Sequence, residues 1–164
     1  MTAVDRSLAS PTSTVSDSTF STAALTVLAT TDIHGHVFDW DYFADAAFPP
    51  SDKGRSSAPL GVSRVATIAK QVRAEQGADS VVMLDNGDTI QGTPLTYLSA
   101  KQPEKLGHDE VMARAFNLVG YDAANIGNHE FNYGVAELFR YHNDLKAPLL
   151  CANVIDVKTG KPLT

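Results

Sequence analysis

The chain has 164 residues, 43% of them hydrophobic, and a formal net charge of −6 with a sequence pI of about 5.2. This length suffices for one domain with its own core. The acidic balance and the lack of a basic stripe argue against binding to a nucleic acid polymer. The single cysteine excludes an intrachain disulfide bond, and Cys151, in the apolar run PLLCANV, is expected to be buried.

The first 23 residues differ in composition from the rest of the chain. They are rich in Ser, Thr and Ala and lack the apolar core of a secretory signal, so residues 1–23 are predicted to be a disordered arm. Residues 24–164 are predicted to form the folded part. No apolar run approaches the roughly 18 residues of a membrane-spanning helix, so no transmembrane segment is expected.

The first half of the folded part alternates between apolar runs and helical patterns. Ala24–Asp32 is apolar, rich in β-branched residues and predicted to be a buried strand. Residues 39–59 contain three prolines and are predicted to be a loop. Ser63–Gln76 has helical periodicity and ends before a glycine, and Ser80–Asp85 is predicted to be the second strand. Residues 87–98 are expected to be a long connection.

The alternation continues in the second half. Asp109–Val119 is predicted to be a helix that Asp109 caps, and it is followed by a third strand at residues 123–126. A helix is predicted over Val135–Leu145 and a fourth strand over residues 148–155. Residues 156–162 look like the turn of a further hairpin. This order of elements predicts an α/β layer fold with a largely parallel sheet.

Polar side chains follow three of the predicted strands. Asp32 and His34 follow the first, Asp88 follows the second, and Asn128 and His129 follow the third. In an open α/β sheet, ligands bind beyond the carboxyl ends of the strands. We therefore expect these groups to meet at one edge of the sheet.

Mixed oxygen and nitrogen ligands of this kind suit two divalent metal ions such as Mn, Zn, Co or Fe. Asp32 and His34 are two residues apart, so in an extended segment both side chains point the same way. The carboxylate of Asp88 can bridge two ions, and the amide oxygen of Asn128 can bind the second ion. Such a pair of ions activates water for attack on a phosphoryl group. His129 would stabilise charge on that group or protonate the leaving oxygen.

Each motif also has a plain structural interpretation. D-x-H alone is weak evidence, and DNGD alone is typical of a hairpin turn. Glu130 either orients His129 or is solvated, and Asn132 either holds the His129 ring by a hydrogen bond or has no such role. Three other histidines are interpreted as surface, boundary or supporting residues: His36, His108 and His142. The ordered set of motifs carries the metal-site hypothesis.

The segments TTDIHGH, DNGDTIQGTPL and GNHEFNYG resemble, in order, the first three motif blocks of the calcineurin-like metallophosphoesterases. The chain is similar to their bacterial branch of 5′-nucleotidases and 2′,3′-cyclic-nucleotide 2′-phosphodiesterase/3′-nucleotidases. Three segments favour the cyclic phosphodiesterase: DWDYF, DNGDTIQGTPL, and GNHEFNYG with Asn132. The resemblance covers roughly residues 25–164.

This resemblance implies a four-layer α/β/β/α sandwich with two sheets between helices. It implies that Asp32 and His34 bind the first metal ion, that Asp88 bridges, and that Asn128 binds the second. His129 would act on the phosphoryl group, with Asn132 standing where the 5′-nucleotidases have an aspartate. The family's later histidine and its G-H-x-H pair have no counterpart here, so the chain is expected to be the amino-terminal part of the catalytic domain, with a carboxy-terminal part missing.

The predicted function is metal-dependent hydrolysis of nucleotide phosphoesters, with 2′,3′-cyclic nucleotides and 3′-nucleotides as substrates. Two alternatives stay open: a 5′-nucleotidase or UDP-sugar hydrolase, and a non-catalytic module that binds a metal or a nucleotide. With part of the ligand set, this segment alone is expected to have little or no activity. The family is typically secreted, periplasmic or attached to the cell wall, and no signal peptide is visible in the sequence.

Overall fold

The computed structural model describes residues 22–47 and 60–163, so most of the predicted arm and part of the predicted loop lie outside the described residues. The described elements follow the alternating order that the sequence predicts. They are β1 (Thr26–Thr30), α1 (Val62–Gln76), β2 (Val81–Asp85), α2 (Pro94–Lys101), α3 (Val111–Val119), β3 (Ala123–Asn125), α4 (Val135–Asp144) and β4 (Leu149–Leu150), with short 3₁₀ helices at Ala78–Ser80, Pro103–Leu106 and His129–Phe131.

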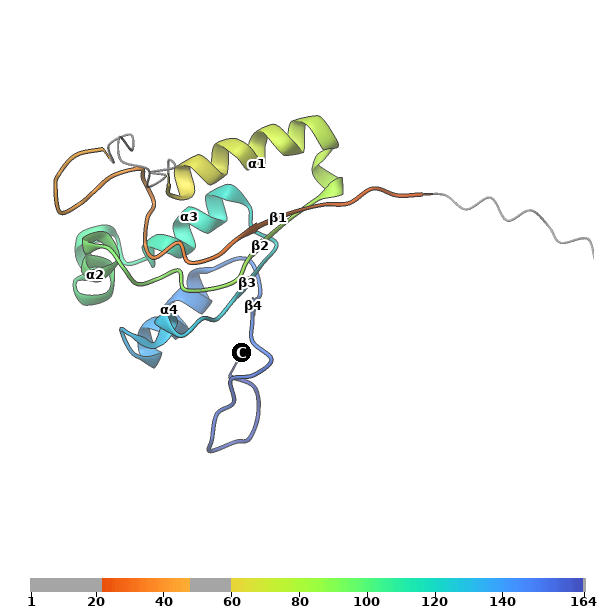
Figure 1. Cartoon of the computed structure of the whole chain (residues 1–164). Coiled ribbons are helices and arrows are strands. Elements are labelled where there is room, and N and C mark those ends of the chain that lie inside the picture. The colour runs from red at the N-terminus through yellow and green to blue at the C-terminus, as the bar shows by residue number, and fades with distance from the viewer. Residues whose placement is uncertain (1–21, 48–59, 164) are drawn as a thin grey trace, which may run out of the picture.

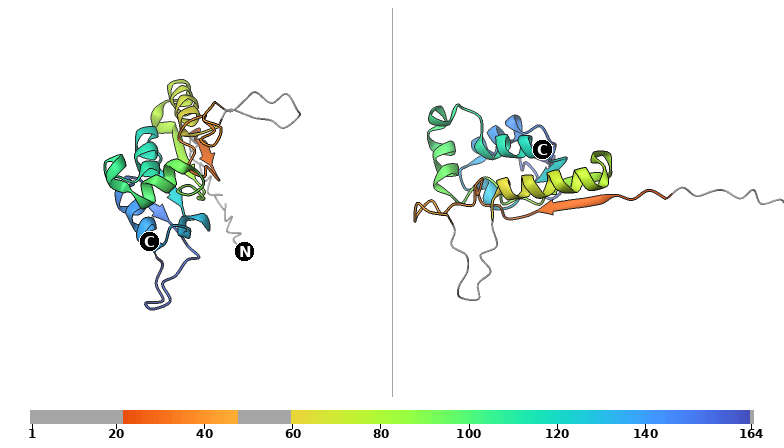
Figure 2. Two further views of the ribbon diagram at one scale, coloured as in Figure 1. Left: turned by 90° about the vertical axis from the view of Figure 1, so that its left-hand side faces the viewer. Right: turned by 90° about the horizontal axis from the view of Figure 1, so that it is seen from above.

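The four strands form one parallel sheet in the order β1-β2-β3-β4 (Figure 1). Crossovers between parallel strands are right-handed, and strands added in sequence order therefore place their helices on the same face. The view from above in Figure 2 shows this arrangement, with the helices on one side of β1. The α/β fold with a parallel sheet is confirmed.

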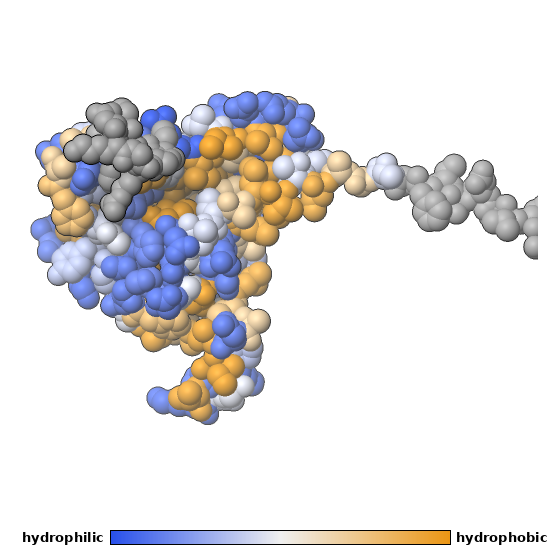
Figure 3. All heavy atoms as spheres, viewed as in Figure 1, coloured by the Kyte–Doolittle hydropathy of each residue, from blue (hydrophilic) through white to orange (hydrophobic). Residues whose placement is uncertain are grey.

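The two faces of the sheet have different environments. The face toward the helices carries Met83, Ala124 and Leu149, all at most 3% exposed, and packs against a core that includes the fully buried Phe116 and Tyr141. The opposite face carries apolar side chains that are exposed or only half-buried. Hydrophobic atoms are visible along this face beside β1 in Figure 3. The second sheet of the predicted sandwich is not among the described residues.

A helix that the sequence pattern does not predict, α2, begins within the connection expected at residues 87–98. Thr93 caps α2 through a reciprocal pair of hydrogen bonds with Thr96, and Pro94 occupies the first helical position. Both are standard signals for a helix start, but the helix has only eight residues and a weak apolar stripe. The helix is too short for its periodicity to be recognised in the sequence.

Other boundaries also differ from the prediction. The carboxylate of Glu110, not that of Asp109, caps α3 by accepting a hydrogen bond from the backbone N–H of Ala113 at 2.7 Å. β4 pairs over two residues only. The predicted terminal hairpin is present as an antiparallel bridge between Ile155 and Pro162. Cys151 is buried, as predicted. None of the helices in the described ranges is long and apolar enough to cross a membrane.

Candidate metal centre

Three motif loops carry the predicted site residues: the first follows β1 with Asp32 and His34, the second follows β2 with Asp88, and the third follows β3 with Asn128 and His129. The first two loops are joined by hydrogen bonds that continue the pairing of β1 with β2. Beyond the last paired residues, the N–H of Asp32 donates to the carbonyl of Gly87 at 3.0 Å, and the N–H of His34 donates to that of Asp88 at 2.9 Å. The sheet therefore holds both loops side by side at the carboxyl ends of their strands. This is the edge at which the sequence predicts a site.

The backbone at three predicted metal ligands is left-handed. The φ angles are 54° at Asp32, 49° at His34 and 58° at Asp88. The expectation that Asp32 and His34 share a face because the segment is extended is therefore wrong. Their side chains approach because the chain turns, and the carboxylate Oδ1 of Asp32 lies 3.7 Å from Nε2 of His34. Residues held in this conformation cluster at functional sites.

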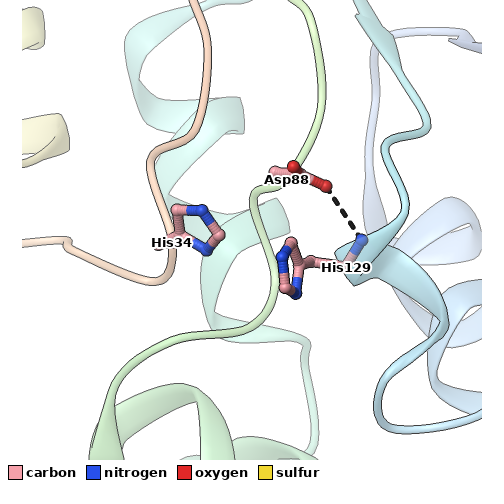
Figure 4. Close-up of side chains that lie close together, drawn as sticks. All are labelled: His34, Asp88 and His129. Carbon is pink, nitrogen blue, oxygen red and sulfur yellow. Dashed lines mark hydrogen bonds between the residues drawn. The ribbon is translucent and has the colours of Figure 1, made fainter.

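The structure brings His34, Asp88 and His129 together. Each offers one ligand atom, and these atoms all lie within 4.8 Å of one another. Figure 4 shows the three side chains, which come from the three motif loops, facing a common space. The imidazole rings of the two histidines have their centroids 4.9 Å apart. All three side chains are half-buried, and the imidazole of His34 and the carboxylate of Asp88 are groups that suit a divalent transition metal.

Hydrogen bonds orient the side chains of this cluster. Nδ1 of His34 donates to the backbone carbonyl of Gln91 at 3.0 Å, which leaves Nε2 as the ligand atom. Oδ1 of Asp88 accepts the backbone N–H of His129 at 2.8 Å. Nδ1 of His129 lies 3.0 Å from the side-chain nitrogen of Asn132. The ring orientations are thus set by groups outside the cluster.

The other two predicted ligands lie beside the cluster. Asp32 is exposed, and its carboxylate also accepts a hydrogen bond from the hydroxyl of Thr31. Asn128 is exposed and directly precedes His129 at the start of the third 3₁₀ helix. A pocket of about 570 Å³ opens beside β1, lined in part by Asp32 and His34.

Two glycines allow the second and third motif loops to approach each other. A Cβ at Gly127 would lie 2.6 Å from the backbone nitrogen of Asp88. A Cβ at Gly87, where φ is 94°, would lie 2.9 Å from the carbonyl carbon of Ile126. Any other residue would push the loops apart, because real Cβ atoms do not approach a backbone so closely.

Two buried carboxylates, those of Glu130 and Asp85, accept hydrogen bonds from the loops that carry the cluster. The sequence alone did not identify either of them as a support for these loops. Glu130 has no solvent exposure, so the expectation that it is solvated is wrong, and its carboxylate binds backbone N–H groups rather than the His129 ring. Asp85, at the end of β2, accepts hydrogen bonds from the hydroxyls of Thr30 and Thr89, both at 2.7 Å. Burial raises the pKa of Asp85. Its position could have been predicted, because it continues the inward alternation of Val81 and Met83.

No protein-family model matches the chain. Among curated proteins, it is 42% identical over 150 residues to the 2′,3′-cyclic-nucleotide 2′-phosphodiesterase/3′-nucleotidase of Yersinia enterocolitica, an alignment that covers 92% of this chain and 21% of that protein. It is 38% identical over 142 residues to the protein of the same name from Salmonella typhimurium, covering 87% of this chain and 20% of that one. The chain thus spans about a fifth of the length of these relatives.

A solved structure agrees with this relationship. The calcineurin-like phosphoesterase YfkN of Bacillus subtilis superposes with a TM-score of 0.63 at 33% identity, covering 77% of this chain and 36% of that one. The fold and the converging motif loops define a calcineurin-like phosphoesterase. Over the segment described here, the chain belongs to that family, and its homologues include the bacterial 2′,3′-cyclic-nucleotide 2′-phosphodiesterase/3′-nucleotidases.

Proposed function

We propose that this chain carries part of the metal centre of a phosphoesterase that hydrolyses 2′,3′-cyclic nucleotides and 3′-nucleotides. The observation that supports the proposal most directly is the convergence of His34, Asp88 and His129 from three separate loops. Three relatives named for this activity, at 37–42% identity, support the choice of substrate.

The proposed ligands divide between two ions, each Mn, Zn, Co or Fe. Asp32 and His34 would hold the first ion, Asp88 would be shared by both, and Asn128 would hold the second. The residues fit this role because Nε2 of His34 is left as the ligand atom and lies 3.7 Å from a carboxylate oxygen of Asp32. When bound, such ions polarise the phosphoryl oxygens and lower the pKa of bound water to about 7.

His129 is assigned to the substrate. The side-chain nitrogen of Asn132 can only donate, so in this arrangement Nδ1 of His129 accepts and Nε2 carries the ring hydrogen. Nε2–H can then donate a hydrogen bond to a phosphoryl oxygen as negative charge develops on it. Asn132 acts through this ring and keeps it in position.

A 5′-nucleotidase is the alternative within the same family. The 5′-nucleotidase precursor of Thermus thermophilus superposes with a TM-score of 0.51 at 25% identity and covers 79% of this chain and 22% of that one. The higher identity to the cyclic-nucleotide enzymes favours the first assignment.

The test is hydrolysis by the full-length protein in Mn²⁺ buffer, with 2′,3′-cyclic AMP, 3′-AMP, 5′-AMP and UDP-glucose compared side by side. We expect the first two substrates to be preferred and Asp88→Asn to reduce kcat/KM at least a hundredfold. Asp45→Asn is a matched control, because Asp45 is exposed, lies outside the cluster and has a similar φ of 49°. Full activity of the Asp88 variant would contradict the proposal, and preference for 5′-AMP or UDP-glucose would favour the alternative.

A further inference from the structure

Glu130 makes an unusual set of contacts for a carboxylate that lies next to a metal-binding motif. It has no solvent exposure, and it accepts four backbone hydrogen bonds. Oε1 accepts from the N–H groups of Thr89 at 2.5 Å and Ile90 at 3.2 Å. Oε2 accepts from those of Asp88 at 2.8 Å and Gly127 at 2.6 Å. One side chain thus ties the loop after β2 to the loop after β3.

These N–H groups replace the water that an exposed carboxylate would bind. Within the described residues, no arginine or lysine forms an ion pair with Glu130. Hydrogen bonds to an ionised acceptor are shorter and stronger than those between neutral groups, and several of them can compensate for burial of the charge. The buried carboxylate therefore requires these four N–H donors, and the donors are in turn held in place by the carboxylate.

The connection between the two loops is reciprocal. Glu130, from the third loop, accepts the backbone N–H of Asp88, while the Asp88 side chain accepts the backbone N–H of His129 at 2.8 Å. The carboxylate of Asp85 accepts one more backbone N–H of this loop, that of Gly87, at 3.0 Å. Every backbone N–H from Gly87 to Ile90 therefore donates to a buried carboxylate.

We propose that Glu130 is a positioning residue that sets the metal affinity of the centre. It holds the left-handed backbone of Asp88 and fixes the distance between the loop of Asp88 and the loop of Asn128 and His129. It is not itself one of the converging ligands. This inference rests on the proposed metal-binding role of Asp88.

The test compares Glu130→Gln with Glu110→Gln in the whole chain. Glutamine keeps the size of the side chain but turns an NH₂ group toward backbone N–H donors, so the four contacts cannot all survive. Glu110 is a matched control because it is 1% exposed and caps α3 outside the motif loops. The readouts are Mn²⁺ affinity, measured from the EPR signal of free Mn²⁺, and amide hydrogen exchange, with circular dichroism as the check on folding.

We expect Glu130→Gln to weaken Mn²⁺ binding at least tenfold and to speed exchange of the amides of Asp88, Thr89, Ile90 and Gly127 at least tenfold. Glu110→Gln should change the Mn²⁺ affinity by less than twofold and should not speed exchange of these amides. Unchanged Mn²⁺ affinity in a folded Glu130 variant overturns the positioning role alone. Absence of Mn²⁺ binding by the wild-type chain overturns the metal centre itself, and the positioning role with it.

A second measurement requires no variant. The carboxylate of the half-buried Asp41 also accepts two backbone N–H groups, those of the exposed Phe43 at 2.9 Å and Ala44 at 3.1 Å. In the metal-free wild-type chain, the amides held by Glu130 should exchange at least a hundredfold more slowly than these two. Equal exchange rates would show that Glu130 does not fix the loops and would overturn the proposal.

Discussion

Glu110 is a buried acid whose ionisation should be visible in the stability of the fold. It is 1% exposed, and burial raises its pKa from 4.5 to about 8, with the backbone N–H of Ala113 opposing this shift. Its second oxygen, Oε1, has no hydrogen-bond partner in the described part of the chain. The nearby guanidinium of Arg140 is paired with Glu137 at 2.6 Å, so it offsets only part of the rise in the pKa of Glu110.

The sign of the effect follows from proton counting. Between pH 4.5 and about 8, the unfolded chain has released the proton of Glu110 while the folded chain keeps it. The folded state then binds more protons, so the free energy of unfolding falls as the pH rises through this window. At about 1.4 kcal/mol per pKa unit, the loss by pH 9 is on the order of 5 kcal/mol. Below pH 4.5 the contribution is zero.

Glu110→Gln removes this titration, so the variant should gain on the wild-type chain by a few kcal/mol between pH 4.5 and pH 9. The assay is urea unfolding followed by circular dichroism at several pH values, with the difference between the two proteins plotted against pH. Glu104→Gln, at an exposed glutamate, should give a flat difference. A flat difference for Glu110→Gln as well would refute the argument that burial holds this proton.

Three further substitutions test the core, the loop approach and the histidine. Phe116→Ala in the fully buried core should lower the free energy of unfolding by about 3–5 kcal/mol, against less than ~0.5 kcal/mol for Phe43→Ala at an 86% exposed side chain, and equal effects would contradict the assigned core. Gly127→Ala should weaken Mn²⁺ binding at least tenfold because its Cβ would lie 2.6 Å from a backbone nitrogen of the second motif loop, whereas Gly160→Ala, in open space, should not. Asn132→Ala should lower kcat of the full-length protein about tenfold and leave Mn²⁺ affinity within twofold, and a matching loss of affinity would argue against its assignment to the ring.

Much of the fold could be predicted because the apolar runs and helical periods are clear. α1, α3 and α4 carry apolar residues at helical spacing, and β1 and β2 are short apolar runs bounded by polar residues. The convergence of the motifs followed from the parallel order of the strands alone. Helix α2 could not be predicted in this way, because eight residues make little more than two helical turns and show no clear apolar periodicity.

The details of the site could not be predicted because they depend on tertiary hydrogen bonds. The sequence gives no sign that His34 is left-handed, since that conformation is fixed by pairing with the loop after β2. It also gives no sign that Glu130 turns inward, since its four donors come from residues up to 42 positions away. The residue types at the site were predictable, whereas the backbone that aims them was not.

The most direct test of the account is Mn²⁺ binding by this chain, followed by the EPR signal of free Mn²⁺, in the wild type, Asp88→Asn and Asp45→Asn. The account predicts that the wild type and the Asp45 variant lower the free Mn²⁺ signal equally and that the Asp88 variant binds at least tenfold more weakly. Equal binding by all three proteins would contradict a metal centre at the cluster of His34, Asp88 and His129.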